Sequence, residues 1–543
     1  MSKAPSAKAL LAENASWDVF ETLGSPLRVG LSIAAPTVSD PLAFNLDDYV
    51  GFTFRDKPIL DLNGVKSHID SGTILKTPNG IITYSFTDHS HLTGLYNNPT
   101  IGFTAGYGFS PFNTAQQAEA RDSIKLWDDL VKPTFVEKNG TGADIQFGNS
   151  YDPAQAYAYY PGSKGYKFQS DVFVADPAVN WTNAWLGYNG YGATTLIHEL
   201  GHTLGLSHPG AYNYDPNLDL TYDNYAEYAQ DSTQYTIMSY WSASETGARI
   251  VDWSTFLLGN AQTPLVHDIV TIQAKYGADP TTRAGNTTYG FNTNAGNEVY
   301  DFSKNAYPYL SIYDAGGVDT LDLSGFNAGA QIDLHAGSFS SAGQALVSAA
   351  TVNANDAALD ALGAGGLGTI DQATVDAVGA RYIARNAASI AADTGVSGVN
   401  ATEYMNLSIA YGTTIENATG TTQRDVLWGN EVANVIKGLG GNDVIDGFEG
   451  KDTLYGGAGA DVFQFHVIEK GDTVADFQTG SDKIDLTGTA VDFSWIGNSA
   501  FHGVGGELRY AGGHLLGDVN GDKVADLDIT VTGSLVQSDV IFL

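Results

Sequence analysis

The stretch "ATTLIHELGHTLGLSHPG", residues 193–210, holds three of the eleven histidines of the chain, at positions 198, 202 and 208. Its apolar spacing predicts a helix from about residue 193 to 204 that ends at Gly205. His198 and His202 are four residues apart, so a helix places them one turn apart on the same face, close enough to share an ion.

Gly205 explains how a third histidine joins the pair. A glycine that ends the helix and turns the chain sharply lets His208 approach the same ion from another direction, whereas a Cβ would oppose the required backbone angles. Three neutral imidazoles and a water suit Zn²⁺ and leave the open position of a catalytic site. Glu199 projects beside the ion, where it can take a proton from a zinc-activated water and pass it to a leaving amine.

The composition limits the function classes. The chain has 543 residues, a formal charge of −35 and no cysteine. The length suggests two to four domains, and the acidic balance argues against nucleic-acid binding. The absence of cysteine excludes disulfides and thiolate sites. We find no transmembrane segment and no Sec signal peptide at the N-terminus, so export would use another route.

The residue patterns along the chain predict three parts. Residues 1–62 form an N-terminal segment. Residues 63–278, which include the histidine stretch, have the pattern of an α+β domain, with strands at 81–88 and 143–149 and a helix at 114–131 capped by Thr114. Residues 279–543 are expected to be all-β, a parallel β-roll or β-sandwich. An Ala-rich segment, 343–400, interrupts them as a helical insertion, expected to be a hairpin added to the roll.

A nine-residue repeat begins at Gly420: GTTQRDVLW, GNEVANVIK, GLGGNDVID, GFEGKDTLY, GGAGADVFQ. Glycine opens every unit, a carboxylate or amide occupies position six, and an apolar residue occupies position eight, the pattern of a calcium-binding parallel β-helix. Turns of stacked units would jointly offer the six to eight oxygens that Ca²⁺ prefers, and position eight would fill the core. The alternative, a low-complexity linker, does not explain the strict phase.

Gln423, Val432 and Asn434 fit the repeat poorly, so the best calcium turns should run from Gly438 to Asp461. Without calcium the stacked carboxylates repel one another, which predicts a domain that folds only at high calcium. The expected ligands in these turns are Gly438, Gly440, Asp443, Gly447, Glu449, Asp452, Gly456, Gly457, Gly459 and Asp461.

These motifs resemble a known family. "HELGHTLGLSHPG" is similar to the extended metzincin signature, and "TIMSYW" (236–241) looks like its Met-turn. Together with the nonapeptides, the match is to the serralysin-type bacterial metalloproteases, over about 64–344 and from 402 to the end. The resemblance implies that Met238 forms the floor of the zinc site. It also implies that Tyr240 is a movable fourth zinc ligand that stabilises the oxyanion.

The resemblance implies further calcium before the repeats. The segments 281–291, 312–326 and 414–420 look like calcium-binding segments of the family, some of them using backbone carbonyls. The residues implied are Arg283, Gly285, Thr287, Asp314, Gly316, Asp319, Thr414 and Glu416.

The resulting hypothesis is a secreted, bacterial zinc endopeptidase stabilised by several calcium ions, a monomer that cleaves proteins and peptides. The end of the chain, "SDVIFL" (538–543), resembles the terminus of type I secretion substrates, which implies that machinery as a partner. The resemblance also implies a periplasmic proteinaceous inhibitor. One alternative is a non-catalytic, calcium-dependent surface or adhesion protein with a relic protease domain. A second is a zinc hydrolase of other substrates.

Two segments of the chain depart from the family pattern. The 343–393 stretch lies where family members pass directly from "GSFS" to "NLSIAYG". The N-terminal segment, residues 1–62, is longer than the short family propeptides. The resemblance implies that it is a propeptide that makes the chain a zymogen, and Asp56 in "FRDKP" is a candidate for the carboxylate that inhibits the protease.

Overall fold

The computed structural model describes residues 45–86, 108–140, 142–151, 153, 155–162, 170–213, 220–365 and 368–543. Most of the predicted N-terminal segment, residues 1–44, lies outside them. The chain divides into two compact units. Unit 1 comprises residues up to Thr282 with Tyr309–Tyr313 and Leu346–Val378, and unit 2 comprises Arg283–Pro308, Asp314–Ala345 and Gly379–Leu543.

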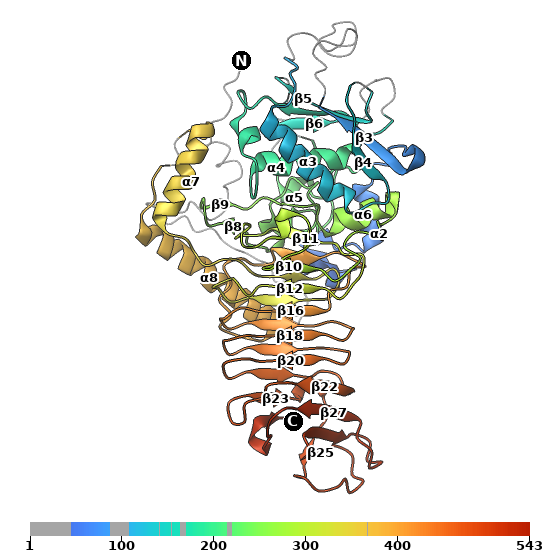
Figure 1. The fold of residues 1–543 in the computed structure, drawn as a ribbon, viewed down its shortest axis with the longest axis vertical. Coiled ribbons are helices and arrows are strands. Elements are labelled where there is room, and N and C mark those ends of the chain that lie inside the picture. The colour runs from blue at the N-terminus through green and yellow to red at the C-terminus, as the bar shows by residue number, and fades with distance from the viewer. Residues whose placement is uncertain are drawn as a thin grey trace. The chain divides into compact units, whose positions relative to one another are not determined.

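Unit 1 is built on a five-stranded sheet with the order β4-β3-β5-β7-β6 (Figure 1). Its strands are parallel except β6, which pairs antiparallel with β7 and forms one edge. The buried strand β7 is apolar throughout, as expected of a strand covered on both faces. The sheet strands are β3 (Ile81–Ser85), β4 (Thr134–Glu137), β5 (Ile145–Ser150), β6 (Ala156–Ala158) and β7 (Val172–Ala175).

Helices complete unit 1. The Trp127 indole N–H of α3 donates to the Ile197 carbonyl of α4 at 3.1 Å, which joins these two helices through a buried contact. The helices are α2 (Leu62–Ile69), α3 (Thr114–Asp128), α4 (Tyr191–Thr203), α5 (Tyr222–Tyr225), α6 (Val266–Tyr276) and α7 (Ala349–Leu362). The short strands are β1 (Thr53–Phe54), β2 (Lys57–Pro58), β8 (Val251–Asp252), β9 (Leu257–Leu258) and β11 (Leu310–Ile312).

The start of α3 differs from the sequence prediction by one residue. Asn113, not Thr114, is the cap: its side chain accepts from the Gln116 N–H, and the Gln116 side chain accepts from the Asn113 N–H. This reciprocal pair satisfies two helix donors at once, which a lone threonine cap could not do.

Residues 45–60 are an integral part of unit 1. The Asp47 carboxylate contacts His267 Nε2 at 2.9 Å and accepts from the Gln230 amide, and all three groups are shielded from solvent. The Leu46 N–H donates to the Tyr235 hydroxyl at 2.8 Å. Asp56, the candidate inhibitory carboxylate, lies in the left-handed turn between β1 and β2.

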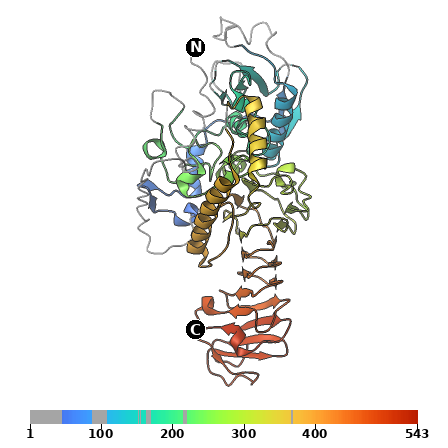
Figure 2. The same ribbon diagram turned by 90° about the vertical axis from the view of Figure 1, so that its left-hand side faces the viewer.

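Unit 2 contains a stack of short parallel strands. Strands β10, β12, β16, β18 and β20 follow one another in one sheet (Figure 1), and β13, β17, β19, β21, β23 and β28 form a second sheet. Figure 2 shows the two sheets edge on. Successive repeats alternate between the sheets, so each strand pairs with the strand two repeats later.

The repeats build both the core and a carboxylate ladder. The position-eight residues Leu427, Ile436, Ile445, Leu454 and Phe463 are all fully buried. At position six, the Asp443 N–H donates to the Asp461 carboxylate at 2.9 Å, and the same link recurs up the stack. The parallel strands are β10 (Thr288–Gly290), β12 (Thr320–Asp322), β13 (Gln331–Asp333), β16 (Asn417–Thr419), β17 (Val426–Trp428), β18 (Val435–Lys437), β19 (Val444–Asp446), β20 (Thr453–Tyr455), β21 (Val462–Gln464), β22 (Lys470–Val474), β23 (Lys483–Asp485) and β28 (Val540–Ile541).

The remaining strands of unit 2 are mostly antiparallel. β25, β26 and β27 form a meander beyond the repeats, which β22 joins in parallel. The strands are β14 (Phe339–Ser340), β15 (Leu407–Ile409), β24 (Ser494–Trp495), β25 (Glu507–Ala511), β26 (His514–Asp518) and β27 (Leu527–Val531).

The Ala-rich segment contains α7 and α8 (Gln372–Thr394). The expectation of a hairpin on the roll is wrong for α7, which belongs to unit 1. There Leu359 and Ala364 bury against Leu257 and the stacked rings of Trp181 and Trp185, a contact that removes apolar surface from water. In the part of the chain that the structure describes, no helix is long and apolar enough to cross a membrane.

Candidate metal centre

Helix α4 and the turn after it bring three imidazoles together. His202 Nε2 lies 3.2 Å from His208 Nε2, which lies 3.3 Å from His198 Nε2. Each Nδ1 lies within hydrogen-bond distance of a carbonyl: His198 of Ile237 at 2.7 Å, His202 of Leu206 at 2.8 Å and His208 of Tyr212 at 3.0 Å. A carbonyl only accepts, so each Nδ1 carries the proton and three Nε2 lone pairs face one another. Such a cluster can hold a metal ion.

Burial keeps these imidazoles neutral. It lowers the pKa of His198 to about 4 and that of His208 to about 3, and the pKa of His202 falls well below its usual value. Neutral imidazole is the form that binds metals, so the centre is ready to bind across the physiological pH range.

Glu199 lies next to this cluster without an alternative partner. The residue is 6% exposed, and its Oε2 has no hydrogen-bond partner among the described residues. Burial raises the pKa of this carboxyl to about 8, and a cation held by the histidines would lower it again. A buried, unsatisfied carboxylate oxygen is costly, so its retention beside the histidines favours a role in handling a proton.

The turn at Gly205 has the predicted geometry. Its φ is +91°, and a Cβ there would come within 2.2 Å of the Thr73 carbonyl oxygen. The Gly205 carbonyl accepts from the Ser71 N–H and hydroxyl. Only glycine fits this left-handed residue pressed against another backbone.

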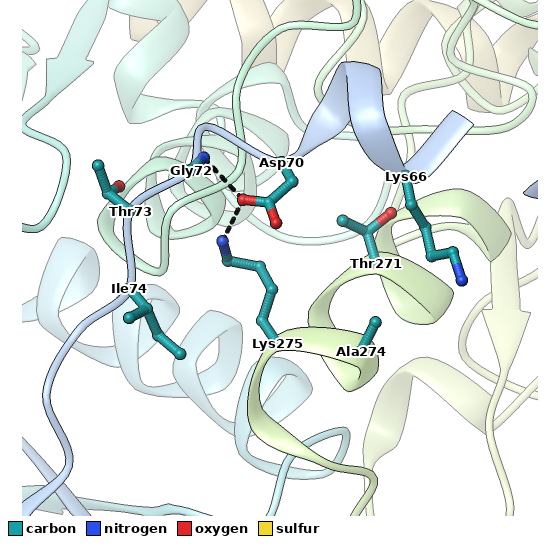
Figure 3. A pocket seen from close by; sticks show the side chains of 8 residues that line it. All are labelled: Lys66, Asp70, Gly72, Thr73, Ile74, Thr271, Ala274 and Lys275. Atoms are coloured by element: carbon teal, nitrogen blue, oxygen red, sulfur yellow. Dashed lines mark hydrogen bonds and ion pairs between the residues drawn. The ribbon is translucent and has the colours of Figure 1, made fainter. Parts of the chain in front are cut away.

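A pocket next to this turn shows what holds the 70–75 segment in place. Figure 3 shows Asp70 bonded both to the Gly72 N–H and to the ammonium of Lys275 from α6, with Ile74 and Lys66 on the walls. The Lys275 side chain is 7% exposed. This ion pair, whose Lys275 side is buried, ties α2 and α6 to the segment on which Gly205 rests.

Met238 lies under α4. It is fully buried, and a Cβ on Gly201 would meet its sulfur at 2.5 Å. Gly201 therefore lets the Met-turn close against the helix directly below the histidines. The turn itself is held by Asp268, which accepts from the Ile237 N–H at 2.7 Å and the Leu265 N–H at 2.9 Å.

Tyr240 lies beside the cluster. Its ring centroid is 4.4 Å from that of His208 and 5.1 Å from that of Tyr212, and the residue is 41% exposed. The structure thus brings together His198, Glu199, His202, His208, Met238 and Tyr240, six residues that the sequence singled out.

The repeat residues also come together. Among the described turns, Asp443 and Asp461 are buried, and the Oδ2 atom of each has no hydrogen-bond partner. Each repeat begins with a glycine pressed against its own position-six side chain: a Cβ on Gly438 would lie 2.2 Å from Asp443 Oδ2. Such carboxylate oxygens, turned toward close-packed backbone, are chemically suited to a hard cation.

The pre-repeat residues form a second acidic group in unit 2. Asp319 accepts from the Thr287 N–H at 2.7 Å, its own N–H donates to Glu416 at 2.7 Å, and its Oδ2 is buried without a partner among the described residues. The Gly316 N–H donates to Asp314 at 2.8 Å. The Thr287 hydroxyl bonds to the Arg283 and Gly285 carbonyls, whereas Thr414 is exposed.

The sequence missed one acidic group. Asp452, Glu469 and Asp472 place one carboxylate oxygen each within 4.8 Å of one another. Glu469 and Asp472 fall after the last regular nonapeptide, so the nine-residue period gives no signal for them. Asp472 continues the ladder by accepting from the Asp452 N–H at 3.1 Å.

Comparison with known proteins gives the family. A family model described as "Peptidase M10 serralysin C terminal" matches residues 278–370 and 348–542. Metallopeptidase AprA of Pseudomonas marginalis is 37% identical over 450 residues, covering 80% of this chain and 81% of that protein. Serralysin of Photorhabdus luminescens is 34% identical over 441 residues, covering 79% of this chain and 77% of its own. Serralysin G of Dickeya chrysanthemi is 32% identical over 531 residues, covering 90% and 92%.

These relatives span both units, so the likeness includes the histidine cluster as well as the repeats. The adhesion alternative, which assumed a relic protease domain, loses its support. The chain belongs to the serralysin family of metalloproteases and is a metalloendopeptidase.

Proposed function

We propose that this metalloendopeptidase is an exported, zinc-dependent protease that calcium stabilises. The observation that carries the proposal is the convergence of three unprotonated Nε2 atoms, that of His208 lying 3.2 Å from that of His202 and 3.3 Å from that of His198, beside a carboxylate oxygen that has no partner among the described residues. Only a cation can satisfy three facing lone pairs at once.

The donor set fits zinc. A tetrahedral ion with Zn–N distances of 2.0–2.1 Å separates its nitrogen ligands by about 3.3–3.4 Å. The nitrogen atoms of the cluster are 3.2 and 3.3 Å apart, so it needs almost no adjustment. Three protein ligands leave a position for substrate or water, as in catalytic zinc sites.

When bound, the ion would polarise the scissile carbonyl and lower the pKa of water. Glu199 then takes the proton of the attacking water and returns it to the leaving amine. Tyr240, whose ring lies against His208, donates a hydrogen bond from its hydroxyl to the oxyanion that forms from the carbonyl.

The substrate would extend the sheet of unit 1. β6 is the antiparallel edge strand, its three residues are half-buried, and the chain continues from it to Tyr160, whose ring contacts His202 at 5.4 Å between centroids. An extended peptide that adds to this edge passes the metal centre and gains main-chain hydrogen bonds without sequence preference.

Calcium is supported by the carboxylates of unit 2. Burial raises the pKa of both Asp443 and Asp452 to about 8, because their charges lack compensation. Bound Ca²⁺ would supply that compensation for the ladder and for the group around Asp319. Folding upon arrival in a calcium-rich medium agrees with the proposed export.

Casein hydrolysis by the full chain loaded with zinc and calcium tests the proposal. We expect cleavage that Glu199→Ala reduces by about 10²–10⁴-fold, the range that general base catalysis contributes. Glu298→Ala, a change at an exposed residue of unit 2, is the control and should retain wild-type activity. Full activity of Glu199→Ala would refute the assigned base.

A further inference from the structure

A second buried carboxylate lies behind the metal centre, and the proposed catalysis does not use it. Asp231 is fully buried in unit 1, seven residues before Met238. Three side chains donate to it: the Tyr212 hydroxyl at 2.8 Å, the Ser239 hydroxyl at 2.7 Å and the Trp241 indole N–H at 3.2 Å.

The donors come from two separate segments of the centre. Tyr212 supplies the carbonyl that accepts from His208 Nδ1, and its ring stacks on His208 at 5.6 Å with an interplanar angle of 9°. Ser239 and Trp241 are the residues on either side of Tyr240. A single carboxylate therefore fixes both the orientation of the third histidine and the backbone that carries the tyrosine.

The same contacts confine the ring of Tyr240. Trp241 packs on Tyr212 at 5.0 Å between ring centroids, and Tyr240 packs on Tyr212 from another side at 5.1 Å. The Ser239 hydroxyl also accepts from the Trp241 N–H at 3.0 Å, which closes the turn around Tyr240. Burying a carboxylate costs several kcal/mol in general, so the site is stable only when its hydrogen bonds are made.

We infer that Asp231 is a positioning residue that fixes the positions of His208 and Tyr240 relative to each other. The inference rests on the proposed roles of these two residues. Asp231 acts through its three donors, which adjoin either His208 or Tyr240. Charge-assisted hydrogen bonds make this arrangement rigid.

The test compares Asp231→Asn with Asp252→Asn in the full chain. Asp252 is a matched control, because it is also a buried aspartate of unit 1 but bonds only within its own loop, to Ser254 and Thr255. Asparagine preserves shape and removes one acceptor, so Asp231→Asn should still fold. Tyr212→Phe removes a single donor and keeps the ring on His208.

Two readouts separate positioning from stability. A phenolate bound to Cu²⁺ absorbs visible light by charge transfer, so the copper-loaded protein reports Tyr240, and Tyr240→Phe identifies the band. Competition with a chelator for zinc reports the histidines. We expect Asp231→Asn to weaken the band, to lower zinc affinity about 10-fold and to lower kcat about 10–100-fold while KM stays within about twofold. Tyr212→Phe should lower zinc affinity by a smaller factor.

The inference is overturned if Asp231→Asn matches Asp252→Asn, with only a lower Tm and an unchanged band and zinc affinity. If the wild-type protein cleaves no peptide, the proposed function fails, but the chelator competition still decides the role of Asp231. If Tyr240→Phe leaves the copper spectrum unchanged, the part of the inference concerning Tyr240 is refuted, and zinc affinity decides the part concerning His208.

Discussion

The metal centre of unit 1 and the carboxylate ladder of unit 2 both gather groups that can hold a cation, but the groups differ in charge. The centre uses three imidazoles that burial keeps neutral, each oriented by a backbone carbonyl. The ladder uses acidic groups, each linked to the next only through a backbone N–H. Neutral ligands do not repel one another without an ion, whereas stacked carboxylates do.

The difference teaches where each ion should matter. We expect a centre preformed from neutral side chains to need its metal for chemistry and hardly for folding. We expect a ladder of acids with raised pKa values to need bound cations in order to fold at neutral pH. The predictions below test this contrast, from the largest expected effect to the smallest.

Removal of calcium should have the largest effect. At pH 8, chelation of calcium is expected to unfold the repeats while α4 and the sheet of unit 1 stay folded, because each cation bound at 100 times its Kd contributes about 2.7 kcal/mol. Hydrogen exchange over residues 420–485 and 191–203 measures the two regions separately.

Removal of zinc alone should abolish proteolysis and leave both exchange patterns nearly unchanged. Simultaneous loss of protection in both regions upon zinc removal would contradict the comparison.

The core of the ladder should tolerate truncation poorly. Ile445→Ala removes a fully buried position-eight side chain and is expected to destabilise calcium-loaded unit 2 by about 2–5 kcal/mol. Val435→Ala, at a position that is 37% exposed on a neighbouring strand, is the control and should cost much less. Urea denaturation in excess calcium gives both values, and equal losses would contradict the assignment of position eight to the core.

The turn at Gly205 should prove more demanding than an ordinary left-handed glycine. Gly205→Ala adds a clash with the Thr73 carbonyl to an unfavourable φ and is expected to cost about 3 kcal/mol and to weaken zinc binding through His208. At Gly247, φ is +106° and an added Cβ would meet nothing within 4 Å. Gly247→Ala therefore measures the cost of the backbone angle alone, which should be about 1 kcal/mol. Thermal unfolding and chelator competition measure the two effects. A similar cost at both positions would show that unit 1 adapts to the clash.

The calcium-free ladder should also depend on pH. Burial raises the pKa of Asp443 and Asp452 to about 8 and that of Asp461 to about 6 in the folded state, against about 3.9 in an unfolded chain. The folded state then binds protons more tightly, so its stability falls as the pH rises from about 4 to about 8. The folded fraction of unit 2 without calcium, measured by hydrogen exchange over residues 420–485, should therefore be higher at pH 5 than at pH 8. Added calcium should reverse this order, and a folded fraction that rises with pH in chelator would refute the argument.

Several features were predictable because they depend on short spacings. The spacing of four positions from His198 to His202 places both on one helix face in any α-helix. The nine-residue period assigns position eight to the core, since each repeat makes one turn and one strand. The cap of α3 was missed by one residue, because the reciprocal bond between Asn113 and Gln116 outweighs the propensity of a nearby threonine.

The sequence by itself therefore predicted the three clustered histidines, the glutamate beside them, the repeat architecture and the likeness to a protease family. Tertiary structure alone decided the rest: that α7 packs against Trp181 and Trp185, that Asp47 buries against His267, and that Asp231 joins residues 212, 239 and 241. The physical reason is distance along the chain. Local spacing fixes which side chains share a helix face or a strand, but contacts between distant segments depend on how whole surfaces pack.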